Sequence, residues 1–146
     1  MPNEKLLATY QETRNEIVQE RGVRMGRSSD AEALLNDARL NLQQAQGKER
    51  LAVQADEDVK EKMRVLTDSL NGMTEKPQYL LDKVSNLGAE QLQTFRKRQA
   101  ATEITRNRQR EITEAQTALA VAQADMQAID KDVADIDSKI REVRSY

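Results

Sequence analysis

An uninterrupted apolar seam in the C-terminal part of the sequence constrains the fold more than any other feature. Between Ile112 and Val143, positions spaced alternately three and four residues apart are all apolar. The seam residues are Ile112, Ala115, Leu119, Ala122, Met126, Ile129, Val133, Ile136, Ile140 and Val143. An apolar repeat of 3.5 residues sustained over several heptads is typical of a long helix that packs along another helix as a coiled coil.

A second seam precedes it and is interrupted by two carboxylates, Glu49 and Asp56. It consists of Ala31, Leu35, Ala38, Leu42, Ala45, Glu49, Ala52, Asp56, Val59, Met63, Leu66, Leu70 and Met73. The segment Ser29–Glu32 fits a capping box, which predicts that this helix begins near residue 30. Asn71 and Gly72 predict its end.

The remaining segments complete an all-α prediction. Gly22, Gly26 and two serines predict a break in the chain. Pro77 favours the first turn of a short helix. The predicted elements are a helix over 3–21, a linker over 22–29, a helix over 30–72, a tip with a short helix over 73–88, and a helix over 89–145. Two long helices joined by a short tip predict a long antiparallel helical hairpin or coiled coil, as one elongated domain over residues 1–146.

The position of the tip also predicts which residues face each other. A tip centred between residues 73 and 88 implies that facing residue numbers sum to about 160. Ala38 would then face Ala122, and Ala45 would face Ala115. Glu49 and Asp56 would lie near Arg108, forming a polar layer that costs stability but fixes the register.

The same register leaves the C-terminal seam, Ile129, Val133, Ile136, Ile140 and Val143, opposite a stretch rich in arginine. A buried seam needs an apolar face opposite it. Either the N-terminal helix folds back and covers it with Leu6, Tyr10 and Ile17, or a second copy or another protein binds there. We therefore treat this seam as a candidate partner-binding surface.

Two further groups of residues are candidate contact sites. The tip gathers apolar side chains that either close the end of the hairpin or bind a partner: Tyr79, Leu80, Leu81, Val84, Leu87, Leu92 and Phe95. A basic run either forms ion pairs within the chain or contacts an acidic partner or nucleic acid: Arg96, Lys97, Arg98, Arg106, Arg108 and Arg110.

Composition limits the chemistry of the chain. It contains neither Cys nor His, which excludes thiol chemistry, structural zinc held by these residues and histidine acid–base catalysis. The acidic residues Asp130, Asp132, Asp135 and Asp137 lack the spacing of a calcium loop and are expected to form a solvated face. No phosphate loop or nucleophile motif is present. We therefore expect no cofactor, no metal, no small-molecule substrate and no enzymatic activity.

The sequence has no apolar run of signal-peptide or membrane-spanning length, so a cytoplasmic location without membrane insertion is the default expectation. Export by an uncleaved route or incorporation into a particle stays open. In its predicted shape and size, the chain resembles the helical-hairpin stalk proteins of type III secretion and flagellar export. It fits components of virions or phages equally well.

These features favour a non-enzymatic structural or adaptor protein that serves as a component of a larger multiprotein complex. It would act through protein–protein contact or through self-association along its coiled-coil seam. The alternative is a nucleic-acid-binding helical protein that uses the basic run over residues 96–110.

Overall fold

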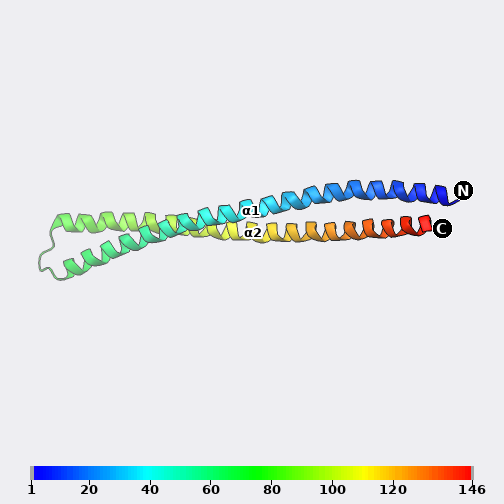
Figure 1. Ribbon diagram of the computed structural model, residues 1–146. Coiled ribbons are helices and arrows are strands. Elements are labelled where there is room, and N and C mark those ends of the chain that lie inside the picture. The colour runs from blue at the N-terminus through cyan, green and yellow to red at the C-terminus, as the bar shows by residue number, and fades with distance from the viewer. Residues whose placement is uncertain (1, 146) are drawn as a thin grey trace. The chain divides into compact units, whose positions relative to one another are not determined.

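Two long helices make up the described part of the protein. The computed structural model describes residues 2–145 and contains α1 (Pro2–Asn71) and α2 (Gln78–Ser145), joined by residues 72–77 (Figure 1). No strand occurs in this described part of the chain. The prediction of an all-helical protein in which two long helices pack against each other is confirmed.

The chain divides into two compact units, each of which contains part of both helices. The first, here called the terminal unit, takes the residues up to Ala38 and those from Ile112 onward. The second, called the turn unit, is Arg39–Glu111 and includes the connection between the helices.

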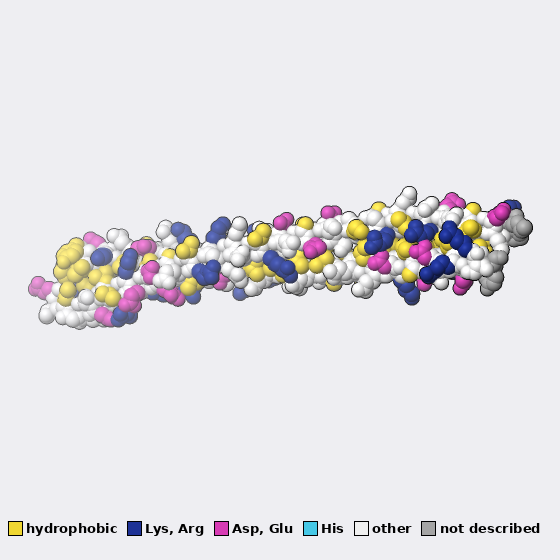
Figure 2. Space-filling model, viewed as in Figure 1, with side chains coloured by type: hydrophobic (Ala, Val, Ile, Leu, Met, Phe, Trp, Pro, Cys, Tyr) yellow, Lys and Arg dark blue, Asp and Glu magenta, His cyan; other side chains and the backbone are white. Residues whose placement is uncertain are grey.

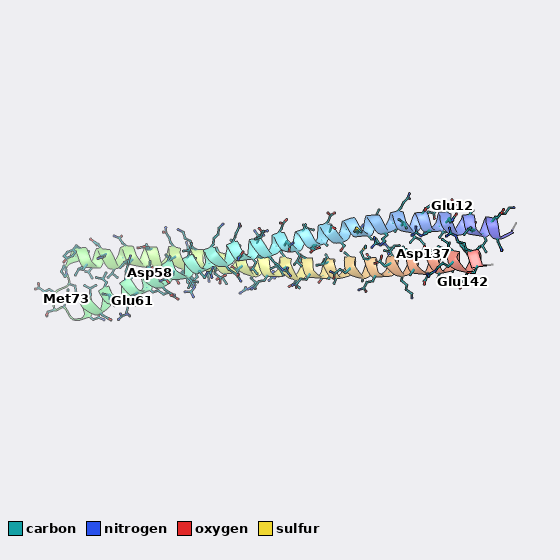
Figure 3. All side chains as sticks on the ribbon, in the orientation of Figure 1. Glu12, Asp58, Glu61, Met73, Asp137 and Glu142 are labelled. Carbon is teal, nitrogen blue, oxygen red and sulfur yellow. The ribbon has the colours of Figure 1, made fainter. Side chains whose placement is uncertain are left out.

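In the terminal unit the two helices pack antiparallel. Arg14 Nε lies 2.6 Å from Asp137 Oδ1, and Arg21 Nε lies 2.6 Å from Asp130 Oδ1. The two residue numbers of each pair sum to 151. Figure 3 shows Asp137 on the stretch of α2 that runs beside the N-terminal part of α1.

The predicted register, with a sum of about 160, is therefore wrong. Its error arises at the connection: α2 begins at Gln78 rather than near residue 89, which moves the midpoint between the helices toward the N-terminus. By the observed pairs, Ala38 does not lie opposite Ala122. Ala45 and Ala115 even belong to different units.

Burial follows the two predicted seams closely. All the α2 seam residues from Ile112 to Val143 are buried or half-buried, and Ile129, Ile136 and Ile140 are 3–6% exposed. On α1, every seam residue from Ala31 to Leu70 is buried or half-buried. The interpretation of both seams as inward faces is confirmed.

The predicted linker over 22–29 is wrong, because α1 runs through it without interruption. The predicted separate helix over 3–21 and the predicted helix start near residue 30 are wrong for the same reason. Two helix-interior glycines cost about 1 kcal/mol each relative to alanine. Contacts to α2 hold this stretch in the helix: Arg21 pairs with Asp130, and Arg24 Nη1 donates to the carbonyl of Asp125 at 3.1 Å.

The connection is shorter than predicted. α1 ends at Asn71, as Asn71 and Gly72 predicted, and Met73 N donates to the carbonyl of Leu70 at 3.1 Å. The carbonyl of Pro77 accepts from Leu80 N and Leu81 N, which starts α2. No separate tip helix forms: the predicted end near Gly88 is wrong, because α2 continues through it.

Candidate functional site

The apolar residues near the connection separate into an inner and an outer group. Leu80 and Val84 are half-buried and Leu87 is 7% exposed, so these three side chains close the end of the turn unit against α1. The outer group is exposed at 40–71% and consists of Met73, Tyr79, Leu81, Leu92 and Phe95. Figure 2 shows hydrophobic side chains gathered at this end, and Figure 3 places Met73 in the connection. The inner group therefore closes this end of the turn unit, while partner binding by the exposed outer group stays a prediction.

Three members of the outer group lie along one face of α2. Leu92 and Phe95 follow Leu81 by 11 and 14 residues, spacings that return to the same side of an α-helix. We call these three residues the apolar stripe. Gly88 falls between them and presents no side chain. A methyl group placed on Gly88 would be in van der Waals contact with Met63 Cε of α1 at 3.8 Å, so α1 borders the stripe at its middle.

The core of the turn unit contains a carboxylate, Asp56, which is 0% exposed. Lys60 Nζ lies 3.0 Å and Arg98 Nη1 3.2 Å from Asp56 Oδ2, while Thr94 Oγ1 donates to Asp56 Oδ1 at 3.1 Å. The hydrogen bond from the Lys60 ammonium, helped by those from Arg98 and Thr94, lowers the pKa of Asp56 against the opposing effect of burial. Asp56 is therefore a charged, fully paired group inside the helix interface.

The sequence predicted this polar layer but assigned the wrong arginine. Arg108 Nη1 pairs with Glu111 at 2.8 Å rather than with Glu49 or Asp56. With the observed register, Arg98 and Thr94 are the residues of α2 that reach Asp56. Their identity follows from the position of the connection, which lies earlier in the chain than the sequence pattern predicts.

A second polar position in the same core lacks internal partners. Glu49 Oε2 and Thr105 Oγ1 are buried and have no hydrogen-bond partner among the described residues. They line a hollow between the helices together with Gln46, Val53 and other residues of the turn unit. This polar position is therefore not satisfied by the chain itself, unlike the Asp56 carboxylate, which has three partners.

Half of the predicted basic run is engaged within the chain. Arg98 pairs with Asp56, Arg106 Nη1 lies 3.3 Å from Glu103 Oε2, and Arg108 pairs with Glu111. Among the described residues, Arg96, Lys97 and Arg110 form no ion pair.

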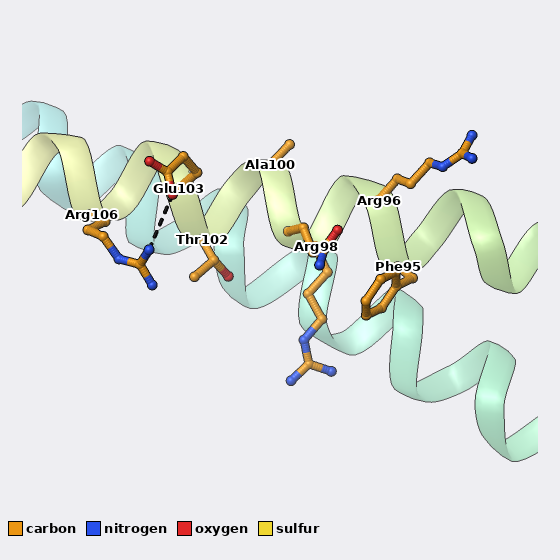
Figure 4. A pocket seen from close by; sticks show the side chains of 8 residues that line it. Phe95, Arg96, Arg98, Ala100, Thr102, Glu103 and Arg106 are labelled. Carbon is orange, nitrogen blue, oxygen red and sulfur yellow. Dashed lines mark hydrogen bonds and ion pairs between the residues drawn. The ribbon is translucent and has the colours of Figure 1, made fainter.

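A surface hollow on α2 shows how these side chains are oriented. It is lined by residues from Phe95 to Arg106. In Figure 4, Phe95, Arg98 and Arg106 point to one side of α2, while Arg96 and Ala100 point to the other. The basic run is thus distributed over two sides of the helix.

The C-terminal seam is covered by the chain itself. Ile129, Ile136 and Ile140 are buried, and Val133 and Val143 are half-buried. The N-terminal part of α1 covers them as a direct continuation of the helix rather than by folding back, with Leu7, Tyr10 and Ile17 half-buried. The expected partner-binding surface at Ile129–Val143 therefore has no exposed apolar face in this structure.

The described residues contain no group of three or more Asp, Glu, His or Cys side chains placed to hold a metal ion. Neither α1 nor α2, over the residues described, has a stretch apolar enough to cross a membrane. The geometry offers contact surfaces: the apolar stripe, the unpaired cations and the exposed acidic residues.

Comparison with protein-family models, with curated proteins and with solved structures finds no match.

Proposed function

We propose that the protein is a non-enzymatic coiled-coil hairpin that acts as a component of a larger protein assembly. In this proposal the apolar stripe near the connection is the surface that binds a protein partner. The observation that carries the proposal is the exposure of Leu81, Leu92 and Phe95, at 40–50%, while Leu80, Val84 and Leu87 already close the end of the turn unit.

The arrangement of the stripe suits a helical partner. Its three side chains span 14 residues of α2, or about 21 Å at 1.5 Å per residue. An amphipathic helix binds through residues spaced three, four and seven positions apart, which matches a stripe of this length. A few well-packed anchor residues, aromatic ones above all, contribute most of the binding energy at many interfaces.

The absence of Cys and His from the sequence supports a role in contact rather than catalysis. Roles like that of a secretion stalk or a virion component both fall within the proposal, because each uses long helices as a framework for other proteins.

Site-specific crosslinking in cells that produce the protein tests the proposal. A photoreactive phenylalanine analogue at Phe95 or Leu92 is expected to capture a protein partner. The same analogue at Leu40, which is 58% exposed on α1, is the matched control. Phe95→Glu should abolish capture from Leu92 while leaving the helix content unchanged. Capture that is equal at Leu40 and Phe95, or absent at all three positions, would refute the stripe as a binding surface.

Nucleic-acid binding is the second candidate, and the unpaired Arg96, Lys97 and Arg110 favour it. It requires an affinity that falls steeply with salt, because phosphate contacts release counterions. A filter-binding titration of single- and double-stranded DNA and RNA at about 50 mM salt tests it, with Arg96→Glu and Arg110→Glu expected to weaken binding. No binding at this low salt would exclude this function.

A further inference from the structure

The two units carry opposite net charge. The turn unit contains 14 basic and 11 acidic residues, whereas the terminal unit contains 9 basic and 14 acidic residues. Their net charges are therefore +3 and −5, which makes a turn unit of one copy electrostatically complementary to a terminal unit of another.

The excess positive charge of the turn unit includes an exposed strip on α2. Lys97, Ala100 and Ile104 are three to seven residues apart, so they share one face of the helix, and Arg96 adjoins it. Figure 4 shows Arg96 and Ala100 pointing away from the side that carries Phe95 and Arg98. Ile104 is 49% exposed, and neither Arg96 nor Lys97 has an ion-pair partner among the described residues. We call the surface formed by Arg96, Lys97, Ala100 and Ile104 the basic strip.

The terminal unit presents a counterpart on α2. Val121, Asp125, Ala128 and Asp132 follow one another at spacings of four, three and four residues, so they also share one face of the helix. All four residues are exposed, and Val121 is 57% exposed. The carboxylates of Asp125 and Asp132 have no hydrogen bond or ion pair in the part of the chain that the structure describes. We call this surface the acidic strip.

The two strips match in spacing as well as in charge. Lys97 and Ile104 are seven residues apart, as are Ala128 and Val121. In an antiparallel contact that sets Ile104 against Val121, Lys97 would lie over Ala128 about 10 Å further along. The small side chain of Ala128 leaves room for the lysine, whose ammonium would lie between the two carboxylates of the acidic strip. One contact would therefore join a cation to carboxylates and an exposed isoleucine to an exposed valine.

We propose that the protein self-associates through this contact, with the basic strip of one copy packed on the acidic strip of a second copy. Each copy offers both strips, so the contact is satisfied by identical chains. It uses neither the apolar stripe nor the buried seam, and it therefore stands independently of the proposed partner surface. Exposed charge pairs contribute modestly and are screened by salt, so the association should be reversible.

A charge-exchange experiment tests the proposal. The basic-reversed variant carries Arg96→Glu and Lys97→Glu, and the acid-reversed variant carries Asp125→Lys and Asp132→Lys. Sedimentation velocity at about 50 mM salt should show concentration-dependent association of the wild-type chain, and about 500 mM salt should weaken it at least tenfold. Each variant alone should sediment as a monomer, and an equimolar mixture of the two should associate again.

Controls separate this contact from a general effect of charge. Arg27→Glu with Arg39→Glu changes the net charge as much as the basic-reversed variant does, but at exposed positions outside both strips. This control should change the association constant by less than about tenfold, and circular dichroism should show unchanged helix content in every variant. A wild-type chain that stays monomeric at low salt, or a mixture of reversed variants that fails to associate, would overturn the proposal.

Discussion

The terminal and turn units each pair a stretch of α1 with a stretch of α2, but by different chemistry. In the terminal unit, α2 contributes a wholly apolar seam, and the charges lie at its margins: the side chains of Arg14 and Asp137, which pair with each other, are 41% and 40% exposed. In the turn unit, polar side chains lie inside the interface. The charged Asp56 is 0% exposed, and the uncharged Thr105 is 8% exposed.

This difference indicates a division of roles between the units. An apolar seam with a 3.5-residue repeat buries similar surface when one helix slides by seven residues, so it stabilises the pair without selecting one alignment. A buried carboxylate tolerates no such shift, because sliding separates it from its partners and leaves a buried charge unpaired. We therefore expect the terminal unit to supply most of the hydrophobic stabilisation and the Asp56 layer to select the register.

Removal of the Asp56 carboxylate should have the largest effect. Asp56→Ala leaves Arg98 without its carboxylate partner in the interface, while the Thr94 hydroxyl keeps the carbonyl of Gln91 as an acceptor at 3.0 Å. Breaking a buried pair is strongly destabilising. We expect the thermal midpoint measured by circular dichroism to fall by roughly 5–15 °C. Asp58→Ala removes an exposed carboxylate two residues away and should change the midpoint by less than about 2 °C. Equal shifts in the two variants would contradict a special role for Asp56.

A core truncation in the terminal unit should come next. Ile136 is 6% exposed, and Ile136→Ala removes buried apolar volume from the continuous seam. The expected loss is about 2–4 kcal/mol in the free energy of unfolding, since the neighbouring side chains relax only partly into the cavity. Hydrogen exchange should show the loss in amides of the terminal unit. Leu34→Ala, at a position 62% exposed in the same unit, should cost less than about 0.5 kcal/mol. If Ile136→Ala were equally mild, the seam would not be the source of stability.

The same contrast explains what the sequence could predict. Both seams and the polar layer follow from the repeat itself, because burial in a helix pair depends on periodicity within each helix. The register depends instead on where the connection lies. Gly88 resembled a helix end and Pro77 a separate start, yet the short connection over 72–77 alone sets which residues meet. Gly22 and Gly26 predicted a break in the helix, but contacts with α2 keep this stretch helical. Contacts with a distant part of the chain cannot be read from the residues around the two glycines.

The site residues likewise divide into those that the helical repeat predicts and those that depend on the register. Exposure of the apolar stripe could not be separated from burial of Leu80, Val84 and Leu87 before the inward face of α2 was known. The sequence did not predict Thr94 as a partner of Asp56, because a single threonine in a helix belongs to no recognisable motif. Only the observed register places Thr94 opposite Asp56.

Acid should weaken the turn unit through Asp56. Hydrogen bonds from Lys60, Arg98 and Thr94 lower its folded-state pKa below the ordinary value of 3.8, so the unfolded chain binds a proton first as pH falls. The stabilising contribution is therefore complete above about pH 4–5 and is lost as pH falls through the folded-state pKa. Urea unfolding from about pH 2 to 7 measures it. Asp56→Asn should be less stable at neutral pH and show a shallower decline in acid, and parallel pH profiles would exclude this linkage.

The smallest effect concerns the glycines of α1, where packing outweighs local preference. A methyl group built on Gly22, Gly26 or Gly47 meets no atom within 4 Å, and no described glycine has a positive φ angle. Alanine at each position should therefore raise the free energy of unfolding by about 0.5–1 kcal/mol, in the terminal unit at Gly22 and Gly26 and equally in the turn unit at Gly47. Chemical denaturation of the Gly26→Ala and Gly26→Ser variants measures their free energies of unfolding and tests whether residues 22–29 are helical or form a linker. Because alanine is the better helix former, it should exceed serine by a few tenths of a kcal/mol. Equal values for alanine and serine at Gly26, with a clear difference at Gly47, would mean that residues 22–29 do not share the helical state of the rest of α1.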